Sequence, residues 1–190
     1  MTEEEYRKVL KQFHKLSDRH ILVAETDMPY SDVVKVVTLS DKIRKAGNEL
    51  VRLMRKNYDQ LLRTKKYRKL LKLYGNTQDK DKRRVLAKQL NEMQSEYNVT
   101  WDFCRKSMIP IGKKYGIDAV FALTKAEDVW RGVAKCLYDN GNTIHFSKYG
   151  ELPCIRAKQI DRGIPMSVKD NKLQFRLGKT MFGMQLKDRF

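Results

Sequence analysis

Residues 40–74 of the chain read SDKIRKAGNELVRLMRKNYDQLLRTKKYRKLLKLY. Apolar residues recur in this stretch at separations of 7, 4 and 7 positions: Ile43, Leu50, Met54 and Leu61. At about 100° per residue, these side chains fall within about 20° of one line along a helix. The spacing predicts one long amphipathic helix, or two helices in tandem.

The opposite edge of this predicted helix is cationic. The same spacing is repeated two positions further along by four basic residues: Lys45, Arg52, Lys56 and Arg63. A charged helix face is often simply solvated, but here residues 41–90 hold 17 Lys or Arg against 5 Asp or Glu. Because charges of one sign repel each other, such a surface is typical of proteins that bind a polyanion. We therefore predict nucleic-acid binding, with phosphate contacts from these four residues.

A second basic helix is predicted over residues 79–96, after turn-forming residues at 75–77. We expect the two helices to form an antiparallel hairpin joined at Gly75, with Arg83 and Arg84 supporting the phosphate contacts. The apolar side of the second helix is made of four residues: Val85, Leu86, Leu90 and Met93.

Residues 91–142 carry 7 basic and 7 acidic side chains, which indicates a scaffold rather than a contact surface. Thr100 is a predicted N-cap, and Pro110 is expected to kink or end the helix that follows. Thr124–Glu127 matches a capping box, which predicts a further helix with an apolar side made of Val129, Trp130, Val133, Cys136 and Leu137. We expect two aromatic residues of this part to lie in the core rather than to stack on bases: Trp101 and Trp130.

Short strands are predicted on both sides of the helical part. The β-branched run Asp32–Leu39 predicts one strand. Five more follow at a spacing typical of a small barrel or meander: Thr143–Phe146, Cys154–Lys158, Met166–Lys169, Lys172–Leu177 and Phe182–Lys187. Residues 143–190 hold 10 basic and 4 acidic residues, and alternation over 172–177 predicts one apolar and one cationic face. We expect further RNA contacts from Lys158, Arg162 and Arg176.

Residues 1–20 form a predicted amphipathic helix that stands outside the cationic region. The first 40 residues hold 6 basic and 7 acidic side chains, so we expect a packing or partner element. The apolar face of this helix is made of Tyr6, Val9, Leu10, Phe13 and Leu16.

The composition argues against several classes of protein. No apolar run reaches the length of a membrane span, and the acidic start MTEEEYRK does not have the pattern of a secretory signal. The 3 cysteines are far apart, which favours reduced core residues in the cytoplasm over a disulfide framework or a zinc ribbon. We find no phosphate-binding GxxxxGKS/T, HExxH or GxSxG motif. We therefore predict no catalytic residues, no metal site and no cofactor.

The order of elements resembles a known family. The helical hairpin, the segment WDFCRKS and the β-rich tail from Gly141 to Gly178 are similar to the N-terminal half of TnpB-like transposon nucleases and related miniature type V CRISPR effectors. The resemblance implies an α+β fold, in which a basic helical recognition (REC-like) domain at 40–142 is inserted into a small oligonucleotide-binding (WED-like) β-barrel. The barrel would comprise 32–39 and 143–190, preceded by an extra N-terminal helix and linker at 1–31. The RuvC nuclease and zinc-binding cysteines that follow in the family have no match here.

The resemblance implies a non-catalytic RNA-binding protein of a prokaryotic cell or a phage-infected host. Its partner would be a structured guide-type RNA or an RNA–DNA heteroduplex, and competition for guide RNA would make it a CRISPR inhibitor. Two alternatives stay open at this point: a module that binds a CRISPR effector protein directly, and a fragment of an RNA-guided nuclease.

Overall fold

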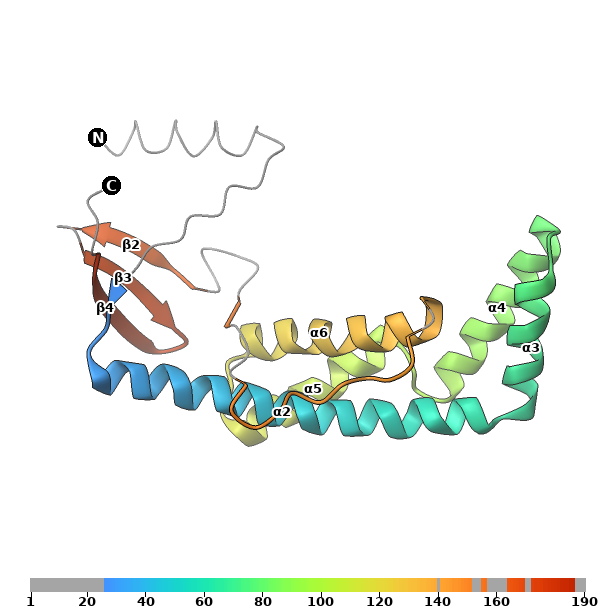
Figure 1. The fold of residues 1–190 in the computed structure, drawn as a ribbon, viewed down its shortest axis with the longest axis horizontal. Coiled ribbons are helices and arrows are strands. Elements are labelled where there is room, and N and C mark those ends of the chain that lie inside the picture. Colours follow the sequence, from blue (N-terminus) through green and yellow to red (C-terminus); the bar gives the residue numbers. More distant parts are fainter. Residues whose placement is uncertain (1–25, 140, 152–154, 157–163, 170–171, 187–190) are drawn as a thin grey trace, which may run out of the picture.

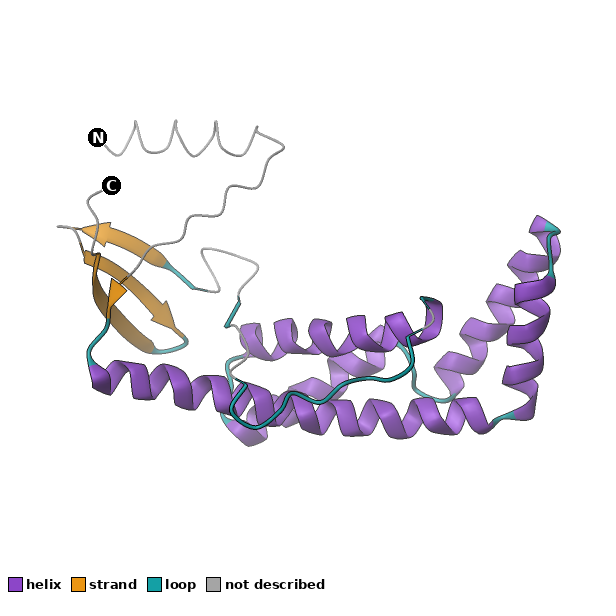
Figure 2. Cartoon of the chain, in the orientation of Figure 1, coloured by secondary structure: helices purple, strands orange, loops and turns teal. Residues whose placement is uncertain are grey.

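The computed structural model describes residues 26–139, 141–151, 155–156, 164–169 and 172–186. Within these ranges the fold is α+β: mostly helical, with a small antiparallel sheet at one end (Figures 1 and 2). The helix predicted over 1–20 lies outside the described residues. The helices are α2 (Tyr30–Arg63), α3 (Lys65–Asn76), α4 (Lys80–Glu96), α5 (Trp101–Tyr115) and α6 (Ala119–Tyr138), and the strands are β1 (Thr26–Asp27), β2 (Met166–Lys169), β3 (Lys172–Leu177) and β4 (Thr180–Leu186).

The stretch 40–74 is divided between two helices in tandem, which is one of the two arrangements that the spacing predicts. Helix α2 runs for 34 residues until Thr64 adopts an extended conformation, with φ −70° and ψ 115°, and α3 begins directly after it. The predicted apolar edge is confirmed, because all four of its residues are buried: Ile43, Leu50, Met54 and Leu61.

The strand predicted over Asp32–Leu39 is wrong, since these residues form the first turns of α2. The carbonyl of Pro29 accepts hydrogen bonds from the amides of Asp32 and Val33, at 2.9 and 3.0 Å, which starts the helix. Helical β-branched residues cost only a few tenths of a kcal/mol each, so continuity with the buried part of α2 outweighs their preference. The strand that precedes the helices is instead β1, paired with β4.

Helix α2 packs against α5 and α6 to form the main core. The predicted N-cap at Thr100 is confirmed, since its hydroxyl accepts a hydrogen bond from the amide of Phe103 at 3.2 Å. Pro110 does not end α5, which continues to Tyr115. Trp101 and Trp130 are half-buried against the core.

The capping box predicted at Thr124–Glu127 is wrong. Asp118 caps α6 instead, accepting a hydrogen bond from the amide of Val120 at 3.0 Å, and the Thr124 hydroxyl donates within the helix to the Val120 carbonyl. The reason lies in the preceding turn. Gly116 ends α5 in the left-handed conformation, with φ 63°, so only two residues separate it from the first residue of α6.

The sheet has the strand order β1-β4-β3-β2, with every neighbouring pair antiparallel. The strands predicted over Met166–Lys169 and Lys172–Leu177 are confirmed, and the last one begins two residues earlier than predicted, at Thr180. Within the described residues the sheet is open, and no pairing closes it into the expected barrel. The alternation in β3 is confirmed: Leu177 is buried, whereas Lys172 and Arg176 are exposed.

The region predicted to be strand at Cys154–Lys158 is described only at 155–156, and these two residues are not in a strand. Cys104 is buried, as expected for a core cysteine, and burial raises the pKa of its thiol to about 12. Among the helices that the structure describes, none combines the length and the apolar composition needed to cross a membrane.

Candidate nucleic-acid interface

The C-terminal part of α2 carries the predicted cationic edge on its solvent side. Arg52, Lys56 and Arg63 are exposed, and no carboxylate of the described chain forms an ion pair with them. Lys45 differs, because its amine lies 2.9 Å from the carboxylate of Asp41. Hydrogen bonds from Lys45 and then Arg44 hold the pKa of Asp41 below its usual value. Three of the four predicted residues thus form no ion pair within the described chain.

Helix α3 turns away from α2 at Thr64 and forms an antiparallel hairpin with α4 (Figure 1). The predicted hairpin is confirmed, although α4 pairs with α3 rather than with α2, and the connection lies at 77–79, after Gly75. Asp79 caps α4, with its carboxylate accepting from the amides of Asp81 and Lys82 at 2.9 and 3.1 Å.

The charged side chains of α3 are all basic. In Lys65–Asn76 there are 5 basic residues and no acidic one, and all five are exposed and outside any ion pair in the described chain. Sequence reasoning included them in the charge count but did not select them as contacts, although a helix with five bases and no acid is itself a signal. They are Lys65, Lys66, Arg68, Lys69 and Lys72.

Two arginines line one cleft at the elbow between α2 and α3. An open cleft there is lined by Arg63 and Arg68, with Asp59 and Leu62. Arg63 was predicted from the helix spacing, whereas the cleft that it shares with Arg68 depends on the bend at Thr64.

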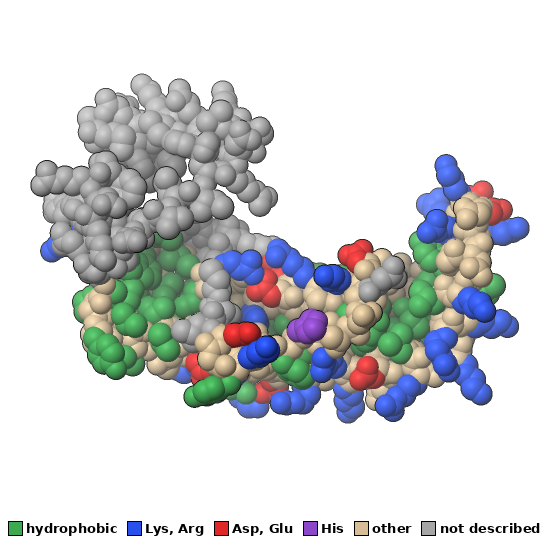
Figure 3. All heavy atoms as spheres, in the orientation of Figure 1, with side chains coloured by type: hydrophobic (Ala, Val, Ile, Leu, Met, Phe, Trp, Pro, Cys, Tyr) green, Lys and Arg blue, Asp and Glu red, His purple; other side chains and the backbone are tan. Residues whose placement is uncertain are grey.

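The predicted residues of α4 lie on the same hairpin. The guanidinium of Arg83 sits 4.7 Å from the centre of the Tyr74 ring on α3, and Arg83 and Arg84 are both exposed. The hairpin projects from the bundle at the end far from the sheet, and basic side chains surround its tip (Figures 1 and 3). We call its exposed bases that form no ion pair in the described chain the cationic hairpin: Lys65, Lys66, Arg68, Lys69, Lys72, Lys80, Arg83, Arg84 and Lys88.

Arg176 lies far from the cationic hairpin. It is exposed on β3, where its amide donates to the carbonyl of Pro165 at 3.0 Å, and the sheet lies at the opposite end of the molecule (Figure 1). Lys158 and Arg162 lie outside the described residues. A ligand that contacts both Arg176 and the hairpin must therefore extend along α2, whose 34 residues span about 50 Å.

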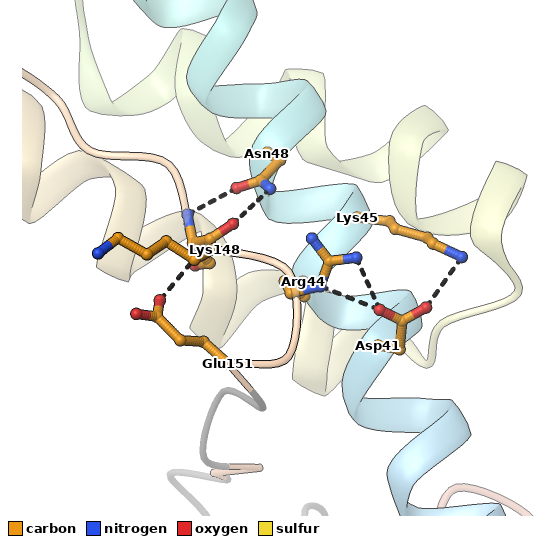
Figure 4. A network of polar contacts seen from close by, with 7 residues as sticks. Asp41, Arg44, Lys45, Asn48, Lys148 and Glu151 are labelled. Atoms are coloured by element: carbon orange, nitrogen blue, oxygen red, sulfur yellow. Dashed lines mark hydrogen bonds and ion pairs between the residues drawn. The ribbon is translucent and has the colours of Figure 1, made fainter.

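Residues 141–151 form a strap that runs along α2 (Figure 1). The strand predicted over Thr143–Phe146 is wrong, because the strap bonds to helix side chains and not to another strand. The Arg55 side chain donates to the Ile144 carbonyl at 2.6 Å and to the Thr143 hydroxyl at 2.5 Å. About two helical turns earlier on α2, Asn48 donates to the carbonyl and accepts from the amide of Ser147, both at 2.9 Å (Figure 4).

We expect Asn48→Ala to loosen the strap without unfolding the bundle, because it removes both bonds to Ser147. Each bond contributes on the order of 1 kcal/mol, so amide exchange at Ser147 should become about tenfold faster or more. Hydrogen exchange followed by NMR measures this rate. Asn48→Asp keeps only the acceptor, so its exchange rate at Ser147 should lie between those of the unaltered protein and Asn48→Ala. Unchanged protection of Ser147 in Asn48→Ala would contradict this account of the strap.

Three carboxylates of the helices α2 and α6 and of the turn before α6 are engaged in structural contacts. Glu49 on α2 accepts hydrogen bonds from the amine of Lys114 and the hydroxyl of Tyr115 on α5, which lower its pKa. Asp128 pairs with Arg156, and Asp118 caps α6. Within the described ranges, no group of three or more His, Cys, Asp or Glu side chains has the geometry to hold a metal ion.

The sequence and structure were compared with known proteins. No protein-family model, curated protein or solved structure matches this chain.

Proposed function

We propose that this protein binds a structured RNA of the guide type, or its heteroduplex with DNA, through the phosphate backbone, and that it does so without cleaving it. The observation that carries the proposal is the cationic hairpin. Its nine basic residues are exposed and form no ion pair within the described part of the chain. A partner with closely spaced negative charges would neutralise this field, and a nucleic-acid backbone has that property.

The geometry of the charges favours recognition of backbone over bases. On α3, Lys65, Arg68, Lys69 and Lys72 fall within about 100° of helix surface, so they form one continuous face. Phosphate contacts of this kind position a protein on nucleic acid but carry little sequence information. A folded RNA is recognised largely by shape and backbone, which agrees with the resemblance to the guide-RNA-binding half of TnpB-like nucleases.

Within this proposal, the biological effect is competition for guide RNA with a CRISPR effector. The chain would hold the RNA on the helical hairpin and along α2, and the effector would lose access to it. RNA recovered with the chain from its host should then be dominated by guide-type RNA, as sequencing of the copurified RNA would show. A random pool of RNA would argue against guide recognition, while an association with an effector protein that survives nuclease and high salt would favour direct protein binding.

The phosphate contacts on α2 are tested by the double variant Arg52→Gln and Lys56→Gln. If each residue contacts a phosphate, the slope of log affinity against log salt for a stem-loop RNA should flatten by about two. Fluorescence anisotropy over a salt series measures this slope. The matched control is Arg105→Gln with Lys106→Gln, because both residues are ion-paired with Asp102 at 3.1 and 2.7 Å and the net charge changes equally. Equal slopes for the two variants would remove the α2 edge from the interface.

A further inference from the structure

The strap presents two aromatic rings to solvent beside the basic edge of α2. Tyr149 is 92% exposed, and Phe146 is 40% exposed. Each ring lies beside an arginine of α2: the guanidinium of Arg44 is 5.5 Å from the centre of the Tyr149 ring, and that of Arg55 is 4.6 Å from the centre of the Phe146 ring.

These arginines are fixed by contacts inside the protein. The Arg44 side chain is buried and donates to Asp41 through Nε and Nη2, at 2.9 and 2.8 Å (Figure 4). Arg55 is half-buried and donates to Ile144 and Thr143 of the strap. Each guanidinium group commits two of its nitrogen atoms to hydrogen bonds inside the protein and lies beside a ring, so both groups are positioned to support the rings.

The backbone that carries the rings is also constrained. Ile144 is buried in the core and anchors one side of Phe146, while the paired bonds of Asn48 hold Ser147. Beyond Tyr149 the chain turns at Gly150, whose φ of 83° suits glycine, and the Lys148 amide donates to the Glu151 carboxylate at 2.9 Å. The backbone that carries the rings is therefore held in place before any ligand arrives.

We propose that this strap is a stacking platform for unpaired bases, with Phe146 and Tyr149 as its two rings. The proposal rests on the proposed function, and it assigns the single-stranded loops or ends of the bound RNA to the strap. A guanidinium beside one face of a ring leaves the other face available, and stacking of a base on an aromatic side chain contributes about 1–3 kcal/mol whatever the base.

Cationic side chains that could bind the phosphates of the same nucleotides lie close to the two rings. Around the axis of α2, Arg52 is about 60° and Lys56 about 100° from Arg55, and both are exposed. Lys148 is exposed on the strap itself, and its amine forms no ion pair within the described chain. Bases on the rings and phosphates on these cations match the combination used by proteins that bind single strands.

The test compares an oligouridylate of about 12 nucleotides, which has no paired bases, with a blunt RNA duplex of similar length. Tyr149→Ala should weaken oligouridylate binding about tenfold, and Tyr149→Ala with Phe146→Ala about a hundredfold, while duplex affinity changes less than about twofold. Tyr149→Phe should retain the affinity, because stacking needs the ring and not the hydroxyl. The matched control is Tyr30→Ala, which removes another ring, 83% exposed, from the start of α2.

The possible results separate the platform from the proposed function. If the double aromatic variant keeps its oligouridylate affinity while Arg52→Gln with Lys56→Gln loses it, the platform is wrong and phosphate binding stands. A chain that binds the duplex but not oligouridylate, or one that Tyr30→Ala weakens as much as Tyr149→Ala, also overturns the platform. Binding to neither probe at low salt overturns the proposed function with it. Far-UV circular dichroism establishes that each variant is folded. If Phe146→Ala perturbs the strap, the single Tyr149→Ala variant still tests the platform, because its ring is 92% exposed.

Discussion

Replacing Lys65, Arg68, Lys69 and Lys72 with glutamine is expected to reduce the affinity for a structured RNA between about a hundredfold and a thousandfold at about 0.15 M salt. The four residues share one face of α3, and none has an ion partner in the described chain. Removing one phosphate contact lowers the slope of log affinity against log salt by about 0.7–0.9. The slope should therefore flatten by about three, and glutamine preserves the helix because its propensity is close to that of lysine.

Anisotropy titrations over a salt series give both the affinity and its dependence on salt. The control removes the same charge elsewhere: Lys35, Lys42, Arg105 and Lys106 to glutamine. Three of these are ion-paired in the structure, with Asp32 or Asp102. An equal loss of affinity in both variants would mean that total net charge determines binding, and it would leave the cationic hairpin without a specific role.

Truncating Leu50 to alanine is expected to reduce the free energy of unfolding by about 3 kcal/mol. The side chain is 0% exposed at the centre of α2, in the core shared with α5 and α6. Its removal loses the transfer free energy of the buried methyl groups and leaves a cavity that well-packed neighbours fill only in part. Urea unfolding followed by far-UV circular dichroism measures the change.

The control for this prediction is Val33→Ala, on the same helix but exposed to solvent. We expect it to change the free energy of unfolding by less than about 0.5 kcal/mol. A loss below about 1 kcal/mol for Leu50→Ala would show that α2 does not form the centre of the core. These variants and those of α3 thus address two separate surfaces: the apolar edge of α2 that maintains the fold, and the cationic hairpin proposed to hold the ligand.

Local patterns in the sequence were sufficient to predict several features. The apolar spacing identified the buried residues Ile43, Leu50, Met54 and Leu61, since helix periodicity places such side chains on one line. Thr100 was recognisable as an N-cap, and the alternation in Lys172–Leu177 as a strand with one apolar face. The exposure of the cationic edge followed in the same way, because charged side chains at that spacing lie opposite the core.

Other features of the fold depended on contacts with parts of the chain that a local sequence pattern does not include. Asp32–Leu39 has β-branched composition but is helical, because Pro29 starts a helix that is continuous with a buried one. The bend at Thr64 lets Arg63 and Arg68 line one cleft, and it makes α3 rather than α2 the partner of α4.

By itself, the sequence determined the apolar and cationic edges of the tandem helices, because side-chain periodicity and charge are local properties. Only the tertiary structure decided where those edges are presented. It placed the strap on α2 through Asn48 and Arg55, and it separated Arg176 from the hairpin by the length of a helix. The physical reason is that residues 88 to 99 positions apart meet there through side-chain hydrogen bonds, which neither propensity nor spacing along the chain encodes.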